Sequence, residues 1–316
     1  MIVIEYGEEI IVVDAGFGFS TLATPGVNYT LPNTTYLEER VGKIKALIIT
    51  HGHMDHVGAI PYIIEKIGNP PIYTREFGAL FIQKRMEEFP TVPKLDLHVV
   101  SKEQGYITLS ENFKVKFFGL THSIPDSTGV IIQTPIGGVV STGDVRVEND
   151  NGVVKQEEID QYAFLKNENI LAMTIDSTGI EKQGWSVSEA VVSKNIDEII
   201  KNATGRTFIA AFSSQIERLM TFMQSAKKHN KFIALEGRSI KSNLAIADFL
   251  KLTDFSHVIP ITDIDDHPPH KVVVLVTGAQ GEEFAALNRI ARDQHKIIKI
   301  RENDTIILSS SVVPGT

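Results

Sequence analysis

Three histidines and an aspartate stand within six residues, directly after an apolar run that predicts a buried strand. The run covers residues 44–50, and the side chains that follow are His51, His53, Asp55 and His56. In an extended segment, residues i and i+2 project to the same side, so His51 and His53 can hold one metal ion. Asp55 and His56 lie around the next bend and can face a second ion. The spacing therefore predicts a metal site where this strand ends.

The chain has 316 residues and contains no cysteine. Disulfides, thiolate catalysis, zinc fingers and iron–sulfur clusters are therefore excluded. A transition metal would have to be held by imidazole and carboxylate groups, which suit zinc and also manganese or iron. The formal net charge of −8 argues against a protein that is basic over its whole surface, although it allows a local basic groove.

No stretch of the chain predicts a membrane span or an export signal. No apolar run reaches the roughly 18 residues that a bilayer requires, and the N-terminus lacks a basic segment before its apolar residues. The sequence therefore predicts a cytoplasmic protein.

The hydrophobic pattern predicts two domains of mixed α/β structure, residues 1–185 and 186–316. Repeated strand–helix alternation in the second part is typical of a parallel sheet with helices on its faces. Capping boxes that begin at Ser186 and Ser214 predict two of these helix starts. The predicted helices are 57–67, 76–87, 186–202, 214–229, 238–252 and 282–293. Residues 145–160 are polar and predict a loop.

Two coordination shells need more ligands than the first cluster offers. His122 and Asp144 each follow an apolar strand and begin a polar loop. Alone, each reads more simply as a turn or capping residue, but beside the histidine cluster both become candidate ligands. The carboxylate of Asp144 can bridge two cations, and Asp14, also at a strand end, can orient a histidine ligand from behind.

In their order and setting, these residues resemble the first four motifs of the metallo-β-lactamase fold. Asp176-Ser177-Thr178 is similar to the first acidic motif of the β-CASP nucleases. The segments 236–239 (EGRS), 277–282 (TGAQGE), 285–289 (AALNR) and 311–315 (SVVPG) are similar to segments of ribonuclease J. The series covers nearly the whole chain and predicts a metallo-β-lactamase αββα sandwich over 1–185, followed by an incomplete β-CASP α/β domain over 186–316.

The resemblance implies a metal-dependent hydrolase that cleaves RNA phosphodiester bonds, as a 5′-to-3′ exonuclease, an endonuclease or both. Two divalent metals, zinc first and manganese or magnesium as alternatives, would activate a hydroxide. The implied ligands are His51, His53 and His122 for one metal, Asp55 and His56 for the other, and Asp144 between them. Asp55, His56 and Asp144 would also be catalytic, and Asp14 and Asp176 would lie behind the ligands.

The same resemblance implies that the chain is truncated at both ends. Family members begin upstream of Met1, and after residue 316 they return to the lactamase domain with its final strands and a further histidine motif. They also form homodimers through a C-terminal domain that this chain would lack.

Four residues of the second domain are candidates for contact with single-stranded RNA: Ser213, Ser214, Arg238 and Ser239. A capping role for Ser214, and packing of Arg238 on its own domain, explain these positions equally well. Two other functions also stay open. The chain can be a metallo-β-lactamase-fold hydrolase of another substrate, or a catalytically weak RNA-binding remnant.

Overall fold

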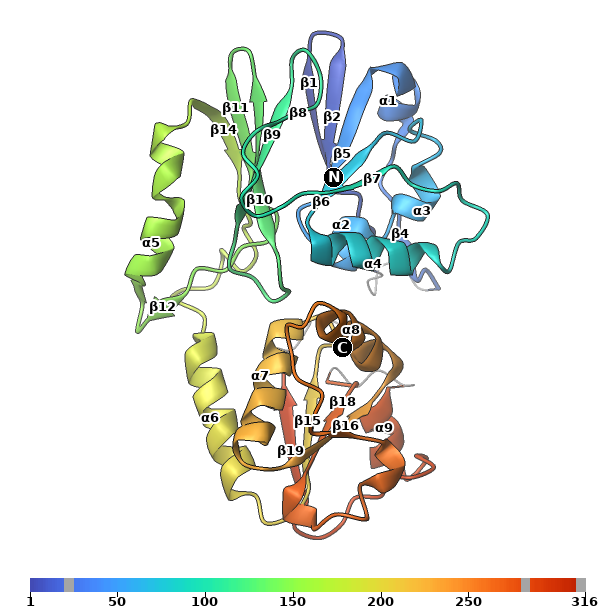
Figure 1. Cartoon of the computed structure of the whole chain (residues 1–316), viewed down its shortest axis with the longest axis vertical. Helices are drawn as coiled ribbons and strands as arrows, with labels where there is room; N and C mark the ends of the chain where they lie inside the picture. The colour runs from blue at the N-terminus through green and yellow to red at the C-terminus, as the bar shows by residue number, and fades with distance from the viewer. Residues whose placement is uncertain (20–25, 280–284, 311–316) are drawn as a thin grey trace. The chain divides into compact units, whose positions relative to one another are not determined.

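The computed structural model describes residues 1–19, 26–279 and 285–310 (Figure 1). The chain divides into two compact units, Met1–Trp185 and Ser186–Thr316.

The first unit contains two five-stranded sheets. The first sheet has the order β1-β2-β5-β6-β7. Its strands are β1 (Ile2–Tyr6), β2 (Glu9–Val13), β5 (Ile44–Ile48), β6 (Ile72–Thr74) and β7 (Leu97–Val99). β1 and β2 form an antiparallel hairpin, and the remaining neighbours pair in parallel.

The second sheet has the order β14-β11-β10-β9-β8. Its strands are β8 (Ile107–Thr108), β9 (Lys114–Gly119), β10 (Thr128–Thr134), β11 (Gly137–Ser141) and β14 (Ile170–Thr174).

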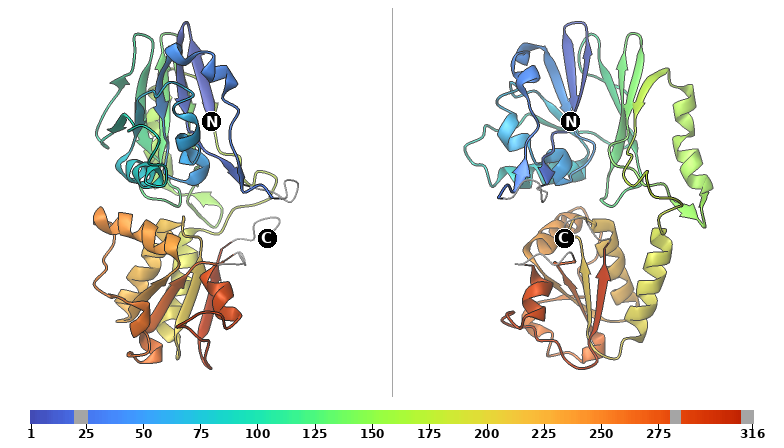
Figure 2. Two further views of the ribbon diagram at one scale, coloured as in Figure 1. Left: turned by 90° about the vertical axis from the view of Figure 1, so that its right-hand side faces the viewer. Right: turned by 180° about the vertical axis from the view of Figure 1, so that it is seen from behind.

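Helices cover the outer face of each sheet (Figure 1). α1 (Thr35–Glu38), α3 (Ile60–Ile63) and α4 (Glu76–Met86) lie outside the first sheet, and α5 (Gln156–Tyr162) lies outside the second. Figure 2 shows the same αββα layering from two further sides.

The apolar residues of β2 are buried on both faces of the strand. In β2, Ile11 and Val13 pack against residues of the second sheet such as Val115, while Ile10 and Val12 face the helices. Successive side chains of a strand point to opposite faces, so a strand in the middle of two layers must be apolar throughout.

The second unit is built on one parallel sheet with the order β17-β16-β18-β15-β19. Its strands are β15 (Thr207–Ala211), β16 (Phe232–Glu236), β17 (Val258–Ile259), β18 (Val272–Val276) and β19 (Thr305–Ser309). Its helices are α6 (Glu189–Asn202), α7 (Ile216–Lys228), α8 (Arg238–Phe249) and α9 (Ala286–Ala291). α9 packs its Ala286 and Ile290 on the face of the sheet that carries Phe208 and Val274.

Short elements complete the described chain. They are β3 (Gly18–Phe19), β4 (Tyr29–Thr30), α2 (Met54–Val57), β12 (Asn149–Asp150) and β13 (Val153–Val154), with 3₁₀ turns at Val41–Lys43, Ala163–Asn167, Ile261–Asp263 and Pro269–Lys271. Within the ranges that the structure describes, no helix is long and apolar enough to cross a membrane.

Several predicted helix bounds are wrong. The predicted helix 57–67 is two short helices, α2 and α3, and α5 occupies part of a segment (145–160) that the polar composition indicated as loop. α6 begins at Glu189 and α7 at Ile216, so each starts after its predicted cap. The first part of the predicted helix 282–293 and the segment 311–315 include residues outside the described ranges.

Candidate metal centre

Four side chains from three segments of the first unit converge on one point. They are His51, His53, His122 and Asp144, and their candidate ligand atoms all lie within 4.8 Å of one another. Nε2 of His51 is 3.0 Å from Nδ1 of His53, which is 3.2 Å from Nε2 of His122. Oδ2 of Asp144 lies 3.9 Å from Nε2 of His51 and 3.7 Å from Nε2 of His122.

Asp144 also belongs to a second group, with Asp55 and His56. Its other oxygen, Oδ1, lies 3.1 Å from Nε2 of His56, and the same Nε2 lies 3.8 Å from Oδ2 of Asp55. The two oxygens of one carboxylate therefore face two different groups of ligand atoms.

The donor atoms of the first group fit a divalent metal. Four ligands at metal–nitrogen distances of 2.0–2.1 Å form a tetrahedron whose edges are about 3.3 Å long. The distances of 3.0 to 3.9 Å among these atoms are close to that value. The cluster can therefore bind a metal.

The local backbone explains how one short segment supplies both groups. Residue His53 is extended, at φ −69° and ψ 151°, and caps α2. His51 and His53 therefore precede the helix, while Asp55 and His56 lie in its turn, and the ring centroids of His51 and His56 are 4.0 Å apart. Gly16 packs directly on this turn, because a Cβ at Gly16 would lie 1.4 Å from the carbonyl oxygen of Asp55.

Asp14 lies behind the histidines and is buried. Its Oδ2 is 2.8 Å from Nδ1 of His56, and its Oδ1 accepts a hydrogen bond of 2.8 Å from the backbone N–H of Thr50. The hydroxyl of Thr50 lies between Asp14 and His51, 3.1 Å from Nδ1 of the histidine. Nothing in the sequence pattern pointed to Thr50, although this residue directly precedes the first histidine.

The loop that carries His122 is held at both ends. At its start, the hydroxyl of Thr121 donates a hydrogen bond of 2.8 Å to buried Glu158 of α5. At its end, Arg75 donates to Oδ1 of Asp126 from both Nε and Nη2, at 3.1 and 2.8 Å. Nothing in the sequence pattern pointed to Arg75 or Asp126.

Asp176 follows β14 and lies beside the cluster. Its Oδ2 accepts a hydrogen bond of 3.4 Å from the backbone N–H of Val145, the residue after Asp144, and its charge acts on His122. It lies outside both groups of candidate ligand atoms.

Burial and mutual repulsion keep two of the histidines neutral. Burial lowers the pKa of His51 well below its usual range, and the neighbouring His56, His53 and His122 lower it further. Burial, together with the charge of His53, lowers the pKa of His122 to about 4, against an opposing effect of Asp144. A neutral imidazole offers the lone pair that a metal needs.

The pKa of His56 is raised in the metal-free chain, unlike that of His51 or His122. Burial alone would lower its pKa, but Asp14 and Asp144 outweigh burial and raise the pKa to about 10. Burial opposes ionisation of Asp144 as well, yet the hydrogen bond and charge of His56 lower the pKa of this carboxyl below its usual value. A metal that binds the second group must therefore displace a proton from His56.

The four residues predicted to contact RNA lie in the second unit, after the carboxyl ends of two strands of its parallel sheet. Ser213 and Ser214 follow β15, and Arg238 and Ser239 begin α8 after β16. The side chains of Arg238 and Ser239 are exposed, and the carbonyl of Ser213 accepts a hydrogen bond of 2.8 Å from Asn243.

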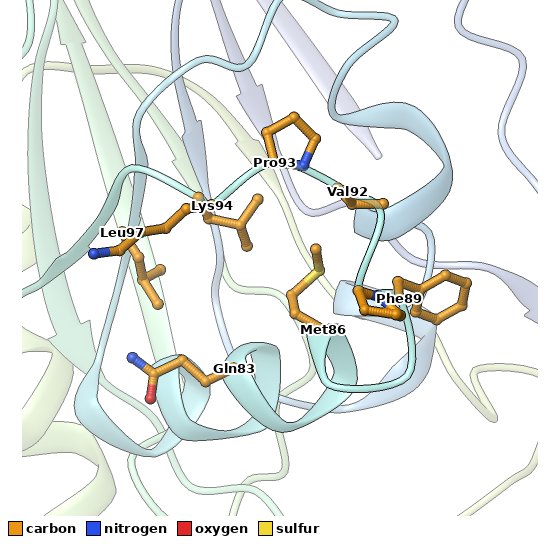
Figure 3. A pocket seen from close by; sticks show the side chains of 9 residues that line it. Gln83, Met86, Phe89, Val92, Pro93, Lys94 and Leu97 are labelled. Atoms are coloured by element: carbon orange, nitrogen blue, oxygen red, sulfur yellow. The ribbon is translucent and has the colours of Figure 1, made fainter.

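A pocket in the first unit lies apart from the candidate metal ligands. This pocket of about 320 Å³ lies at the end of α4, among residues such as Met86, Phe89 and Leu97 (Figure 3). None of the candidate ligands lines it.

Comparison with known proteins identifies the family of the chain. Residues 1–200 match the family model described as the metallo-beta-lactamase superfamily. The chain belongs to the metallo-beta-lactamase superfamily. Residues 204–316 match the model described as the beta-CASP domain of ribonuclease J. The predicted fold class, a metallo-β-lactamase domain followed by a β-CASP domain, is confirmed.

Curated relatives named ribonuclease J match nearly the whole chain. The chain is 35% identical to ribonuclease J of Mycoplasma genitalium in an alignment of 316 positions, which covers 99% of this chain and 55% of that protein. It is 35% identical to ribonuclease J of Thermus thermophilus in an alignment of 321 positions, which covers 99% of this chain and 56% of that protein. The predicted resemblance to ribonuclease J is thus confirmed, and the chain spans about half the length of these relatives.

Among solved structures, a protein of unknown function from Enterococcus faecalis V583 aligns with a TM-score of 0.62 at 14% sequence identity. The alignment covers 96% of this chain and 83% of that one. This likeness supports the fold.

Proposed function

We propose that this chain holds two divalent metal ions at the candidate centre and hydrolyses phosphodiester bonds of RNA. The observation that carries the proposal is the position of Asp144, whose two oxygens face two separate groups of ligand atoms. A carboxylate with one oxygen toward each group would hold two cations close together, as in two-metal hydrolases of phosphodiesters.

The proposed ligands follow the two groups. His51, His53 and His122 would hold one ion and Asp55 and His56 the other, with Asp144 contacting both. Zinc is the proposed metal because imidazole nitrogens predominate, and manganese and magnesium are the alternatives. When bound, the ions supply Lewis acidity and positive charge to phosphoryl oxygens. The remaining residues orient the ligands: Asp14 holds His56, and Asp176 supports the segment after Asp144.

RNA is the proposed substrate because the second unit matches a ribonuclease J β-CASP model and the relatives are named ribonuclease J. We propose single-stranded RNA, cleaved from the 5′ end, internally or both, with contacts to Ser213, Ser214, Arg238 and Ser239. The family resemblance also supports a cytoplasmic location and a homodimer.

The test uses the purified chain with its metal content measured by plasma mass spectrometry. 5′-Monophosphorylated single-stranded RNA and small esters are offered side by side. We expect about two metal ions per chain and cleavage of RNA that stops on chelation. Asp144→Asn should lower the content of both ions, whereas Asp55→Asn should lower that of one.

The two alternative functions give different results. Turnover of the small esters without RNA cleavage would favour a hydrolase of another substrate. RNA cleavage that is unchanged in His53→Ala would come from a contaminant, and the chain would then be an RNA-binding remnant.

A further inference from the structure

We propose that the hydroxyl of Thr50 relays the orienting effect of Asp14 from His56 to His51, so that one carboxylate selects the ring tautomer of a histidine in each metal group. Thr50 is then a positioning residue that acts through His51. The inference rests on the proposed metal ligation, because the selected tautomer matters only if His51 is a ligand.

The geometry brings four groups into one buried chain of hydrogen bonds. Oδ2 of Asp14 lies 2.8 Å from Nδ1 of His56 and 2.9 Å from the hydroxyl of Thr50. That hydroxyl lies 3.1 Å from Nδ1 of His51 and 3.4 Å from Nδ1 of His56. Asp14, Thr50 and His51 are all buried, so water does not compete for these bonds.

The number of protons decides the direction of each bond. An ionised carboxylate only accepts, so His56 donates its Nδ1–H to Asp14. The hydroxyl of Thr50 has a single proton, and it also donates to Asp14, which is the nearer and charged acceptor. Thr50 can then only accept from His51, and Nδ1 of His51 must carry the proton.

This assignment leaves a lone pair on Nε2 of His51, and on His56 it leaves Nε2 as the nitrogen from which a metal would displace the proton. In the first group, Nε2 of His51 faces Nδ1 of His53 and Oδ2 of Asp144. In the second, Nε2 of His56 faces Oδ1 of Asp144. The opposite tautomer of His51 would place a proton on Nε2, where a metal requires a lone pair.

The backbone of Thr50 holds the relay in place. Its N–H donates to Asp14, and its carbonyl accepts hydrogen bonds from both the N–H and the hydroxyl of Thr128, the latter at 2.8 Å. Thr128 thus offers a matched control, since its buried hydroxyl bonds the same residue without contacting a histidine.

The experiment compares Thr50→Val, Thr50→Ser and Thr128→Val in the full chain. Zinc affinity is measured by competition with a chelator, and the ring tautomers of the metal-free chain by long-range ¹H–¹⁵N NMR. Thr50→Val should raise the dissociation constant of the more tightly bound zinc ion by about 10- to 100-fold. This is the usual effect of removing a residue that hydrogen-bonds to a metal ligand. Thr50→Val should also abolish the Nδ1–H tautomer signal of His51, whereas Thr50→Ser and Thr128→Val should resemble the wild type.

Three results would overturn the inference. They are a wild-type His51 that carries its proton on Nε2, a Thr50→Val variant with unchanged tautomer, and equal losses in Thr50→Val and Thr128→Val. Failure of the proposed function looks different, because the wild type would then bind no zinc while the tautomers of the metal-free chain still report on the relay.

Discussion

Nη2 of Arg75 lies 2.8 Å from Oδ1 of Asp126, although 51 residues separate the two in the chain. Arg75 caps α4 and is buried, and Asp126 ends the loop that begins at His122. The pair therefore ties the position of one candidate metal ligand to a helix of the first unit.

Asp126→Asn should destabilise the chain and weaken its metal binding. The amide keeps the shape and tolerates the positive φ of 65° at this position, but it leaves the buried guanidinium without a counter-charge. Breaking a buried pair in this way costs about 3 kcal/mol or more in the free energy of unfolding. Urea denaturation and zinc titration measure the two effects.

The control is Glu88→Gln, which removes the exposed partner of Arg85. A surface pair contributes roughly 0–1 kcal/mol, so this variant should be close to the wild type. Equal stability of Asp126→Asn and the control would show that the pair does not hold the loop.

Gly16→Ala should disrupt the second group of ligands. The added methyl carbon would lie 1.4 Å from the carbonyl oxygen of Asp55, so the turn that carries Asp55 and His56 must move. Gly42→Ala is the matched control, because a Cβ there meets no atom within 4 Å. We expect Gly16→Ala to lose one of two bound metal ions while Gly42→Ala keeps both. Two bound metal ions in Gly16→Ala would contradict the prediction that close packing of Gly16 positions the turn with Asp55 and His56.

The metal-free chain should lose stability as the pH rises from about 6.5 to about 10. The folded chain raises the pKa of His56 from 6.5 to about 10 through Asp14 and Asp144, which outweigh burial. Protonated His56 therefore stabilises the fold fully below pH 6.5, and this contribution is lost as the pH passes through the folded value. Urea denaturation in the presence of chelator, at a series of pH values, measures the decline.

A His56→Gln variant isolates the contribution of this ring from other groups that titrate at alkaline pH. Its stability should fall less steeply over the same range. Parallel curves for the two proteins would assign the decline to groups other than His56.

Arg206 should be needed for the stability of the second unit but not for metal binding. It lies at the start of β15 and bonds Asp304, 98 residues later, and the two side chains are only 1% and 2% exposed. Arg206→Met leaves the buried carboxylate unpaired, which costs about 3–5 kcal/mol. Differential scanning calorimetry and metal analysis separate the two effects.

The double variant Arg206→Met/Asp304→Asn removes the stranded charge as well. It should be more stable than Arg206→Met alone, because the cost comes mainly from an unpaired buried charge. A lower stability of the double variant would argue that each residue acts through separate contacts.

Much of the strand layout could be predicted from the sequence, because buried strands are read from contiguous apolar runs such as 44–50. Helix bounds were less predictable. α5 lies within a segment rich in charged residues, and its helical state depends on contacts such as that of Glu158 with Thr121. The polar composition alone indicated a loop there.

By itself, the sequence determined the chemistry available to the site. With no cysteine, and with His51, His53, Asp55 and His56 in one short segment, only imidazole and carboxylate ligands were possible. Their roles as ligands stay predictions. The alternation of side chains along an extended segment also predicted that His51 and His53 belong to one metal site, and Asp55 and His56 to another.

Only the tertiary structure decided how these groups are arranged. It brought Asp144 between the two groups, placed Thr50 between Asp14 and His51, and set Arg75 against Asp126. Each of these contacts joins side chains whose meeting depends on how separate strands and loops pack. Local sequence patterns reach only a few residues along the chain, whereas these distances are set by the packing of whole layers.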